Sequence, residues 1–346
     1  MQYSQCSICR RNEATKTNSH LIPSFLLTMV SSADHSGRRD TEMLYTIGPN
    51  ITKAYIGRKV PQIELEKNFN EISEERIKEL SHHNAAKDYI FCPRCERLLG
   101  NLLESPYSNF LFQGQKIPPE IPYLFWLSVI WRVSFYNIFG EVKLKTYQEA
   151  SLRNRLYGYL QAKENNAEIS HLFDNLPFQY RMLYCQGYSK EGSGFQYGRY
   201  DEKNKLLSII FGDIILCVHF GSTKLSDNYT FYGLEQLFRQ SPLNDGGNIE
   251  RHLDITSETL KESSKMLMDE LRSVRLKVNR KYIIEFWKHL RRKAPLLPIE
   301  PEEKFIESSI YHLYNDDNKI GEKITYQHYA KAIANAFKDV YGIDVK

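Results

Sequence analysis

The chain has 346 residues, of which 42% are hydrophobic and 25% charged, and its formal net charge is +4 at pH 7. This composition is typical of a globular protein with two or three domains, and it excludes an intrinsically disordered chain. The sequence has no phosphate-binding Walker loop, no dinucleotide-binding glycine pattern and no internal repeat. We therefore do not expect the chain to hydrolyse ATP by itself.

Two Cys-x-x-Cys pairs stand near the start of the chain, Cys6 with Cys9 and Cys92 with Cys95. A single pair of this kind is also typical of a redox dithiol, but two pairs supply the four thiolates of a closed tetrahedral zinc site. We therefore predict one structural zinc ion held by these four residues.

The remaining cysteines are Cys185 and Cys217, which lie in apolar, aromatic stretches and are expected to be buried, inert thiols. The polar N-terminal residues do not resemble a secretory signal. This favours a reduced, cytoplasmic protein over a disulfide framework.

Residues 32–87 form a long insertion between the two cysteine pairs. Within it the alternating stretch Met43–Ile47 predicts a strand, and the charged stretch Glu71–His82 predicts a helix. A connection of this length is more often functional or mobile than idle. Arg38 and Arg39 are candidates for gripping nucleic-acid phosphates, with an ordinary solvated loop as the alternative.

Three short motifs follow one another in the sequence: Ser19–Pro23 (SHLIP), Phe91–Glu96 (FCPRCE) and Leu127–Arg132 (LSVIWR). The order of the first Cys-x-x-Cys pair, His-Leu-Ile-Pro and Cys-x-x-Cys-Glu resembles the zinc-bearing branch of the HNH endonucleases, whose ββα-metal fold places a histidine at the end of a β-hairpin. With Leu127–Arg132 added, the three motifs are also similar to bacterial proteins with an SHIIP core, a CxxCE knuckle and an LSxLWR helix, a likeness that brings no known activity with it.

The resemblance implies that His20 is a general base, which takes a proton from the attacking water, and that a magnesium or manganese ion grips the scissile phosphate. Glu96, directly after the last cysteine of the knuckles, is the implied ligand of that ion. The chain departs from the family pattern at Ser19, where a carboxylate is usual, and at Lys87, where an asparagine is usual. The alternatives for His20 are a zinc ligand and a packed histidine.

Residues 93–105 read as a helix that Pro93 opens. Glu96, Gly100 and Glu104 follow one another at intervals of four residues, so they are expected to share a face. Glu104 is therefore a second candidate ligand of the catalytic ion, with a solvated surface carboxylate as the alternative.

The most hydrophobic run of the chain is Ile121–Phe139. Its length would suit a membrane span, but Pro122, Arg132 and Asn137 interrupt it. We predict a buried helix at the centre of a domain, in which Arg132 must be paired or hydrogen-bonded.

A helical stretch about Tyr147–Glu164 is followed by short aromatic or β-branched runs that predict a small antiparallel sheet packed against the apolar helix. These runs are Tyr180–Tyr188, Gly194–Tyr200, Leu206–Phe211 and Asp213–Phe220. Residues 226–248 read as a linker or irregular edge.

Helical patterns return after Thr256, and Asn279 is the predicted N-cap of the second helix. The predicted helices are Ser257–Leu276, Asn279–Arg292, Glu302–Tyr314 and Tyr326–Tyr341. One side of the second helix gathers five basic residues, namely Arg280, Lys281, Lys288, Arg291 and Arg292. Such a face fits contact with nucleic-acid phosphates, and it equally fits the solvated side of a helical bundle.

These patterns and the resemblance predict an α+β protein with a zinc-stabilised, ββα-metal-like module over 1–115. A hydrophobic helix with a small antiparallel sheet follows over 116–250, and a helical region over 251–346. The expected function is a metal-dependent endonuclease that cleaves DNA, which is favoured over RNA, and that defends bacteria against invading DNA together with a partner protein. The alternative is a catalytically inactive zinc-bearing nucleic-acid-binding or adaptor protein on the same scaffold. No membrane partner is expected.

Overall fold

The computed structural model of the chain describes residues 4–17, 19–30, 43–47, 52–57, 60–69, 72–81, 85–140, 142–191, 194–221, 224–315 and 324–344. The chain divides into two compact units. Unit 1 comprises Met1–Arg39 and His82–Ser263, and unit 2 comprises Asp40–Ser81 and Ser264–Lys346. The expected boundary near residue 115 lies inside unit 1, which thus holds both the cysteine pairs and the hydrophobic helix. Arg38 and Arg39 lie outside the described residues.

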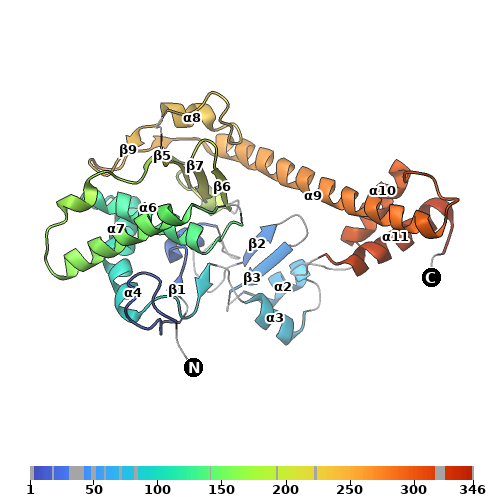
Figure 1. Cartoon of the computed structure of the whole chain (residues 1–346), viewed down its shortest axis with the longest axis horizontal. Coiled ribbons are helices and arrows are strands. Elements are labelled where there is room, and N and C mark those ends of the chain that lie inside the picture. The colour runs from blue at the N-terminus through green and yellow to red at the C-terminus, as the bar shows by residue number, and fades with distance from the viewer. Residues whose placement is uncertain are drawn as a thin grey trace. The chain divides into compact units, whose positions relative to one another are not determined.

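A short β-ribbon and a helix organise the N-terminal part of unit 1 (Figure 1). Strand β1 (Ser19–His20) pairs antiparallel with β4 (Ala86–Lys87), and helix α4 (Pro93–Leu99) follows β4. Between β1 and β4 the chain first forms α1 (Ser24–Thr28), which buries two leucines. The ribbon therefore joins segments that lie more than sixty residues apart in the sequence, with His20 at the end of its first strand.

The helix expected over 93–105 is longer and less regular than predicted. After α4 the chain passes through a π-helical turn, η2 (Gly100–Glu104), and continues as α5 (Ser105–Gln113). The N–H of Ser105 donates to the carbonyl of Gly100, five residues earlier, as a π turn requires. Pro106 lacks the N–H that a regular helix would donate to Leu102, which favours a widened turn at this place.

The hydrophobic run forms α6 (Glu120–Phe135), in which every residue from Ile121 to Ser134 is buried. The helix ends earlier than predicted, because Asn137 adopts a left-handed conformation with φ of 49°. Helix α7 (Thr146–Glu164) packs against it. Within the described part of the chain, no helix is long and apolar enough to cross a membrane.

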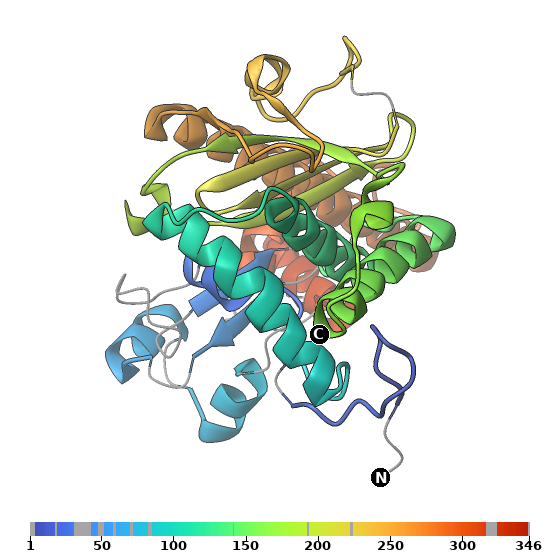
Figure 2. The ribbon, with the colours of Figure 1, turned by 90° about the vertical axis from the view of Figure 1, so that its left-hand side faces the viewer.

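The predicted sheet is present and rests on α6 (Figure 2). Its strand order is β10–β5–β8–β7–β6, with β9 also paired to β5, and its pairs are antiparallel except β10 with β5. Trp126 of α6 stacks against Phe211 of the sheet with ring centroids 6.2 Å apart, so the sheet and the helix share one core. The hairpin predicted at Phe211–Asp213 is confirmed, with Gly212 at a φ of +55°.

The bounds of the strands are β5 (Gln179–Tyr184), β6 (Gln196–Asp201), β7 (Leu206–Phe211), β8 (Ile214–His219), β9 (Leu243–Asn244) and β10 (Leu253–Asp254). Two 3-10 turns and a short helix complete unit 1, namely η3 (Ser170–Phe173), η4 (Tyr188–Glu191) and α8 (Glu235–Gln240). The last of these lies in the stretch that was expected to be irregular.

In the first segment of unit 2, the strand predicted at Met43–Ile47 is confirmed as β2, which pairs antiparallel with β3 (Thr52–Ile56). Helices α2 (Gln62–Phe69) and α3 (Glu74–Leu80) follow. Ile56, Leu65 and Leu80 form a small core of buried residues. The insertion therefore contains a folded element with its own apolar cluster.

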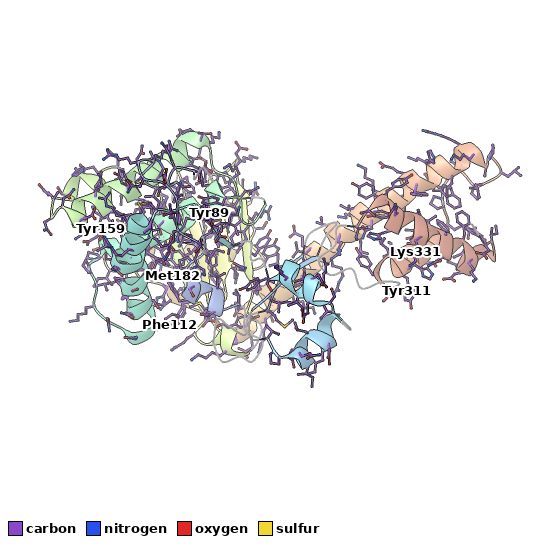
Figure 3. The ribbon with its side chains drawn as sticks, turned by 90° about the horizontal axis from the view of Figure 1, so that it is seen from below. Tyr89, Phe112, Tyr159, Met182, Tyr311 and Lys331 are labelled. Carbon is purple, nitrogen blue, oxygen red and sulfur yellow. The ribbon has the colours of Figure 1, made fainter. Side chains whose placement is uncertain are left out.

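The C-terminal part begins with α9 (Ser257–Lys293), a single helix where two had been predicted. Asn279 is not an N-cap: it is buried in mid-helix, where its side chain hydrogen-bonds Tyr314 and accepts from Tyr329 Oη at 2.6 Å. Helices α10 (Glu303–Asn315) and α11 (Tyr326–Tyr341) carry Tyr311 and Lys331, respectively (Figure 3).

A shared aromatic core joins these C-terminal helices. Trp287 of α9 stacks on Phe337 of α11 with centroids 5.6 Å apart, and Phe305 of α10 meets both rings edge-on. The apolar side of the predicted amphipathic helix, including Ile283, faces this core.

Candidate metal centre and the adjoining acidic site

The first cysteine pair lies on a tight loop at the start of the described chain. The Cys6 N–H donates to the Asn12 carbonyl at 2.9 Å, and the Arg10 N–H donates to the Cys6 carbonyl at 2.8 Å. Arg10 has a φ of 54°, which turns the chain directly after Cys9. The loop thus brings both thiols to the same side.

The second pair lies at the beginning of α4. Cys92 is the N-cap residue, and its sulfur accepts a hydrogen bond from the Cys95 N–H at 3.5 Å. Asn12, from the first loop, donates to the same sulfur at 3.7 Å. Donors of this kind favour a thiolate at Cys92 and orient it, as the outer shell of a metal site does.

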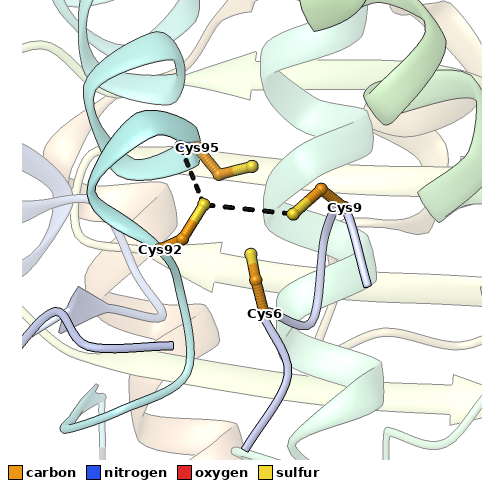
Figure 4. Close-up of side chains that lie close together, drawn as sticks. All are labelled: Cys6, Cys9, Cys92 and Cys95. Carbon is orange, nitrogen blue, oxygen red and sulfur yellow. Dashed lines mark hydrogen bonds between the residues drawn. The ribbon is translucent and has the colours of Figure 1, made fainter. Parts of the chain in front are cut away.

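The four sulfurs converge on one point (Figure 4). They all lie within 4.8 Å of one another, and Cys9 Sγ is 3.9 Å from Cys92 Sγ. A tetrahedral zinc ion with Zn–S bonds of about 2.3 Å separates its sulfurs by about 3.8 Å. All four cysteines are buried, the most exposed at 4%. The cluster could therefore hold a metal ion such as zinc, with no position open to water.

Without a bound cation the four thiols do not ionise alike: the hydrogen bond from Cys95 lowers the pKa of Cys6. The pKa of Cys95 is raised, because its thiol donates to the Cys6 sulfur and because it is buried, while burial raises the pKa of Cys92. Four neighbouring thiolates would repel one another, and a divalent ion removes that repulsion. The remaining thiols behave as expected: Cys185 and Cys217 are buried, and burial raises the pKa of Cys217 to about 12.

The cysteine cluster is fastened to the helices of unit 1. Ser7 Oγ lies 2.7 Å from Tyr136 Oη, just beyond the end of α6, and Arg153 of α7 donates to the Ile8 carbonyl at 2.9 Å. These contacts fix the first loop, which carries Cys6 and Cys9, against α6 and α7.

An acidic site adjoins the cysteine cluster, because Glu96 directly follows Cys95 on α4. His20 ends β1 and is partly exposed, whereas Ser19 before it is fully buried. The pKa of Glu96 responds to Ser19, Glu104, Arg132 and Lys16, so all of these groups lie around its carboxyl group.

The π turn brings Glu104 over Glu96. In a regular α-helix two residues eight positions apart differ by about 80° around the axis. A π turn takes up one extra residue, which reduces the difference to about 20°. The four-residue spacing predicted that both carboxylates share a face. In this chain the π turn, and not the spacing alone, aligns them.

Arg132 of α6 connects the parts of this site, although it is only 1% exposed. Its Nη1 donates to the His20 carbonyl at 2.9 Å and to Glu104 Oε1 at 2.8 Å. Its Nε and Nη2 donate to the carbonyl and the hydroxyl of Ser128. The buried cation thus joins the end of β1 to the π turn, and it neutralises Glu104.

Glu96 is the group whose hydrogen bonds are incomplete. Burial raises the pKa of Glu96 and the nearby Glu104 carboxylate adds to the rise, while Ser19, Arg132 and Lys16 oppose it. Among the described residues, buried Glu96 Oε2 has no hydrogen-bond partner, and the Ser19 hydroxyl beside it lacks the geometry for one. A buried carboxylate oxygen without a donor is costly, so this position suits a proton or a cation.

Sequence reasoning identified His20, Glu96 and Glu104. The structure places Glu104 and Arg132 near the Glu96 carboxyl group, and it joins the His20 backbone carbonyl to Glu104 through Arg132. Sequence reasoning anticipated that Arg132 would be paired, but not that its partners belong to this site. The two departures from the family pattern lie opposite each other, since Ser19 pairs with Lys87 across the ribbon. The Lys87 ammonium lies over the Tyr136 ring, 5.3 Å from its centroid.

The basic residues of the predicted face on α9 differ in their contacts. Arg280 forms an ion pair with Glu303, and Arg291 Nε donates to the Leu297 carbonyl at 3.3 Å. Three cations of the face are exposed, namely Lys281, Lys288 and Arg292.

Comparison of the chain with protein-family models, with curated proteins and with solved structures gave no match. The chemistry of the site therefore rests on its own residues.

Proposed function

We propose that the protein is a metal-dependent endonuclease of the HNH type, in which a zinc ion bound by the four cysteines holds the acidic site in place. The observation that supports the proposal is that buried Arg132 joins the His20 backbone and Glu104 close to Glu96, beside a closed four-cysteine cluster. The order of a two-stranded ribbon, a cysteine pair and a helix supports it as well.

Each side chain has a distinct part in the proposed reaction. His20 accepts a proton from a water molecule, whose oxygen forms a bond to phosphorus as the bond to the leaving oxygen breaks. Glu96, with an oxygen that lacks a donor, and Glu104 would bind a magnesium or manganese ion, which when bound polarises the phosphate and stabilises the leaving oxygen. Arg132 acts through Glu104 and the His20 backbone, and is therefore a positioning residue.

The substrate and setting are part of the same proposal. We infer DNA, rather than RNA, as the substrate, and a partner protein that recruits or activates the nuclease in a defence against invading DNA. The exposed cations Lys281, Lys288 and Arg292 supply a surface suited to phosphates. These inferences follow from the resemblance of the motifs and from the charge of that surface.

The direct test is cleavage of plasmid and linear DNA by zinc-loaded protein, with magnesium, with manganese and with neither, alone and after addition of an extract of the source cells. His20→Ala should reduce metal-dependent cleavage on the order of a hundredfold or more, the share usual for a general base. The matched control is His171→Ala, which removes an exposed imidazole from the same unit.

The outcomes separate two functions. Cleavage that is lost in His20→Ala and kept in His171→Ala supports the nuclease, provided that both variants retain zinc. Cleavage that survives His20→Ala makes the assignment of His20 wrong. If DNA is bound but never cut under any of these conditions, the protein is a zinc-bearing binding or adaptor protein on this scaffold. The Arg132–Glu104 ion pair and the absence of a carboxylate at Ser19 are the observations that favour this second function.

A further inference from the structure

A cavity of about 560 Å³ lies in unit 1, at the end of the sheet where β5 begins and β8 ends. Its volume falls within the range of roughly 300–1,000 Å³ that is typical of small-molecule sites. The residues of the cysteine cluster and of the acidic site are not among its lining residues. The cavity is therefore separate from the cysteine cluster and from the acidic site.

Aromatic side chains form the apolar part of the wall. Phe173, Phe178 and Phe220 line the cavity, and the last two rings lie 5.8 Å apart. Phe178 is buried and stacked on Tyr123 with centroids 4.6 Å apart, which holds it rigidly. Rigid aromatic faces of this kind bind planar rings such as nucleic-acid bases by stacking.

Polar groups stand beside these rings. Gln179 and His219 are direct partners on neighbouring strands, and both line the cavity, although His219 is only 1% exposed. Asp245 lies in the loop after β9, where the Gly247 N–H holds one of its carboxylate oxygens at 3.0 Å. The Gln179 amide and the Asp245 carboxylate together offer both donors and acceptors, as the edge of a base requires, while the His219 imidazole contacts Cys217 Sγ at 3.8 Å.

The glycine in this loop permits the arrangement. Gly246 has a φ of +80°, and a Cβ added to it would lie 3.0 Å from the Tyr123 ring. The loop can therefore approach the aromatic wall closely only because this position has no side chain. The approach places Asp245 at the rim of the cavity.

The charge of the wall selects among possible ligands. Asp245 is its one carboxylate, and none of the lining residues that the structure describes is a lysine or an arginine. A phosphate would gain no cation from the lining residues themselves, although the Lys205 side chain lies beside Gly221, whereas a neutral ligand with amino groups would donate to Asp245. We propose that this cavity binds a nucleobase as part of a free nucleoside, with its ring against the phenylalanines and its amino group at Asp245.

The test is calorimetric titration of the full-length, zinc-loaded protein with guanosine, adenosine, cytidine and uridine. The three nucleosides that carry an amino group should bind at least tenfold more tightly than uridine. Asp245→Asn should remove that preference, and Phe220→Ala should weaken all of them about tenfold. Asp227→Asn, which changes an exposed aspartate of the same unit, should bind as the parent does.

Further arms identify the source of the base and the outcomes that overturn the proposal. Guanosine monophosphate should bind no more tightly than guanosine. A short single-stranded oligonucleotide that binds more tightly than the nucleoside would assign the site to a base of a nucleic-acid strand. The proposal is overturned if folded protein binds none of the nucleosides, if Asp245→Asn binds them unchanged, or if choline binds in their place. Because cleavage is not measured, these results do not depend on the nuclease.

Discussion

Two glutamates of unit 1, the partly buried Glu96 and the buried Glu250, differ in how their oxygens are satisfied. Glu250 accepts from Tyr107 Oη at 2.7 Å, from Trp126 Nε1 at 3.0 Å and from Tyr180 Oη at 2.5 Å. Glu96 has neighbours that affect its pKa but has a buried oxygen with no donor among the described residues.

The difference separates a fully hydrogen-bonded carboxylate from one that has an oxygen without a donor. A buried polar network in which every group has its partner rigidifies a core, and the Glu250 network ties α5, α6 and β5 together in this way. The partly satisfied Glu96 carboxylate on α4, next to Glu104 of the π turn, leaves a position for a ligand. Both clusters have aromatic or basic residues of α6 at their centre, Trp126 in one and Arg132 in the other.

The largest expected effect comes from removing what holds Glu96 in place. Cys92→Ser should lose the bound metal and most of the folding energy of the N-terminal segment, since zinc binding in such sites supplies on the order of 10 kcal/mol. Elemental analysis should show about one zinc in the parent and none in the variant, and hydrogen exchange should rise in residues 4–30 and 85–99. Exchange around Glu250 should change little.

Cys185→Ser is the control, because it removes a buried thiol that is not part of the cluster. It should retain the metal. A parent protein purified without chelator that contains no metal would contradict the assignment, and so would full metal content in Cys92→Ser.

The next effect tests the two glutamates against each other with the same conservative change. Glu250→Gln replaces one of two acceptor oxygens by an amide nitrogen, which then faces either Tyr107 or the pair Trp126 and Tyr180, so the free energy of unfolding should fall by about 2–3 kcal/mol. Glu96→Gln removes a poorly satisfied buried carboxylate, and its stability should be unchanged or higher. Urea unfolding followed by circular dichroism measures both. Equal losses would remove the distinction between the two clusters.

A smaller effect is the pH dependence of the Glu250 network. Burial raises the pKa of Glu250 to about 6, although its three donors oppose the rise. Between its ordinary pKa of 4.5 and about 6, the native state then binds more protons than the unfolded state. The contribution of Glu250 to stability is therefore complete below the lower value and falls, by about 2 kcal/mol in total, as the pH rises through the upper one.

Urea unfolding at several pH values between 4 and 8, in roughly half-unit steps, would measure this slope in the parent and in Glu250→Gln. The difference between their stabilities should shrink as the pH rises from about 4.5 to about 6 and then remain constant. Parallel curves across this window would show that the native pKa of Glu250 is ordinary.

The parts of this protein that could be predicted are those determined by the chemistry of single residues or by the local periodicity of hydrophobic residues. Two Cys-x-x-Cys pairs predict one cluster whatever the intervening chain does, and Cys6 and Cys95 do meet. The strand at Met43–Ile47 and the helix at Tyr326–Tyr341 were predicted to the residue, because their patterns are regular.

The parts that could not be predicted depend on contacts between distant segments. Asn279 looked like a helix cap, but Tyr314 and Tyr329 satisfy its side chain from other helices, so α9 continues through it. The donors around Glu250 come from three separate segments, and no local pattern marks them. Arg132 was expected to need partners, but only the fold identifies those as Glu104 and the His20 carbonyl.

The smallest expected effect concerns the exposed cations of α9. Lys281, Lys288 and Arg292 fall on one stripe, because residues seven and four positions apart lie on the same side of a helix. Arg280 and Arg291 are engaged by Glu303 and by the Leu297 carbonyl, so they are poor choices for substitution. Lys288→Gln combined with Arg292→Gln should weaken DNA binding by about 1 kcal/mol, roughly fivefold, if the stripe contacts phosphates.

Salt dependence is the decisive measurement for this stripe, since each lost phosphate contact lowers the slope of log affinity against log salt by about 0.9 for duplex DNA. Fluorescence anisotropy at several salt concentrations should therefore give a shallower slope for the double variant. The control, Lys190→Gln with Lys203→Gln, removes the same charge from exposed positions of unit 1 and should keep the slope of the parent. If both double variants change the slope equally, net charge accounts for the binding and α9 is a solvated face. Because the stripe lies outside the acidic site, a shallower slope should leave the metal dependence of cleavage as it was.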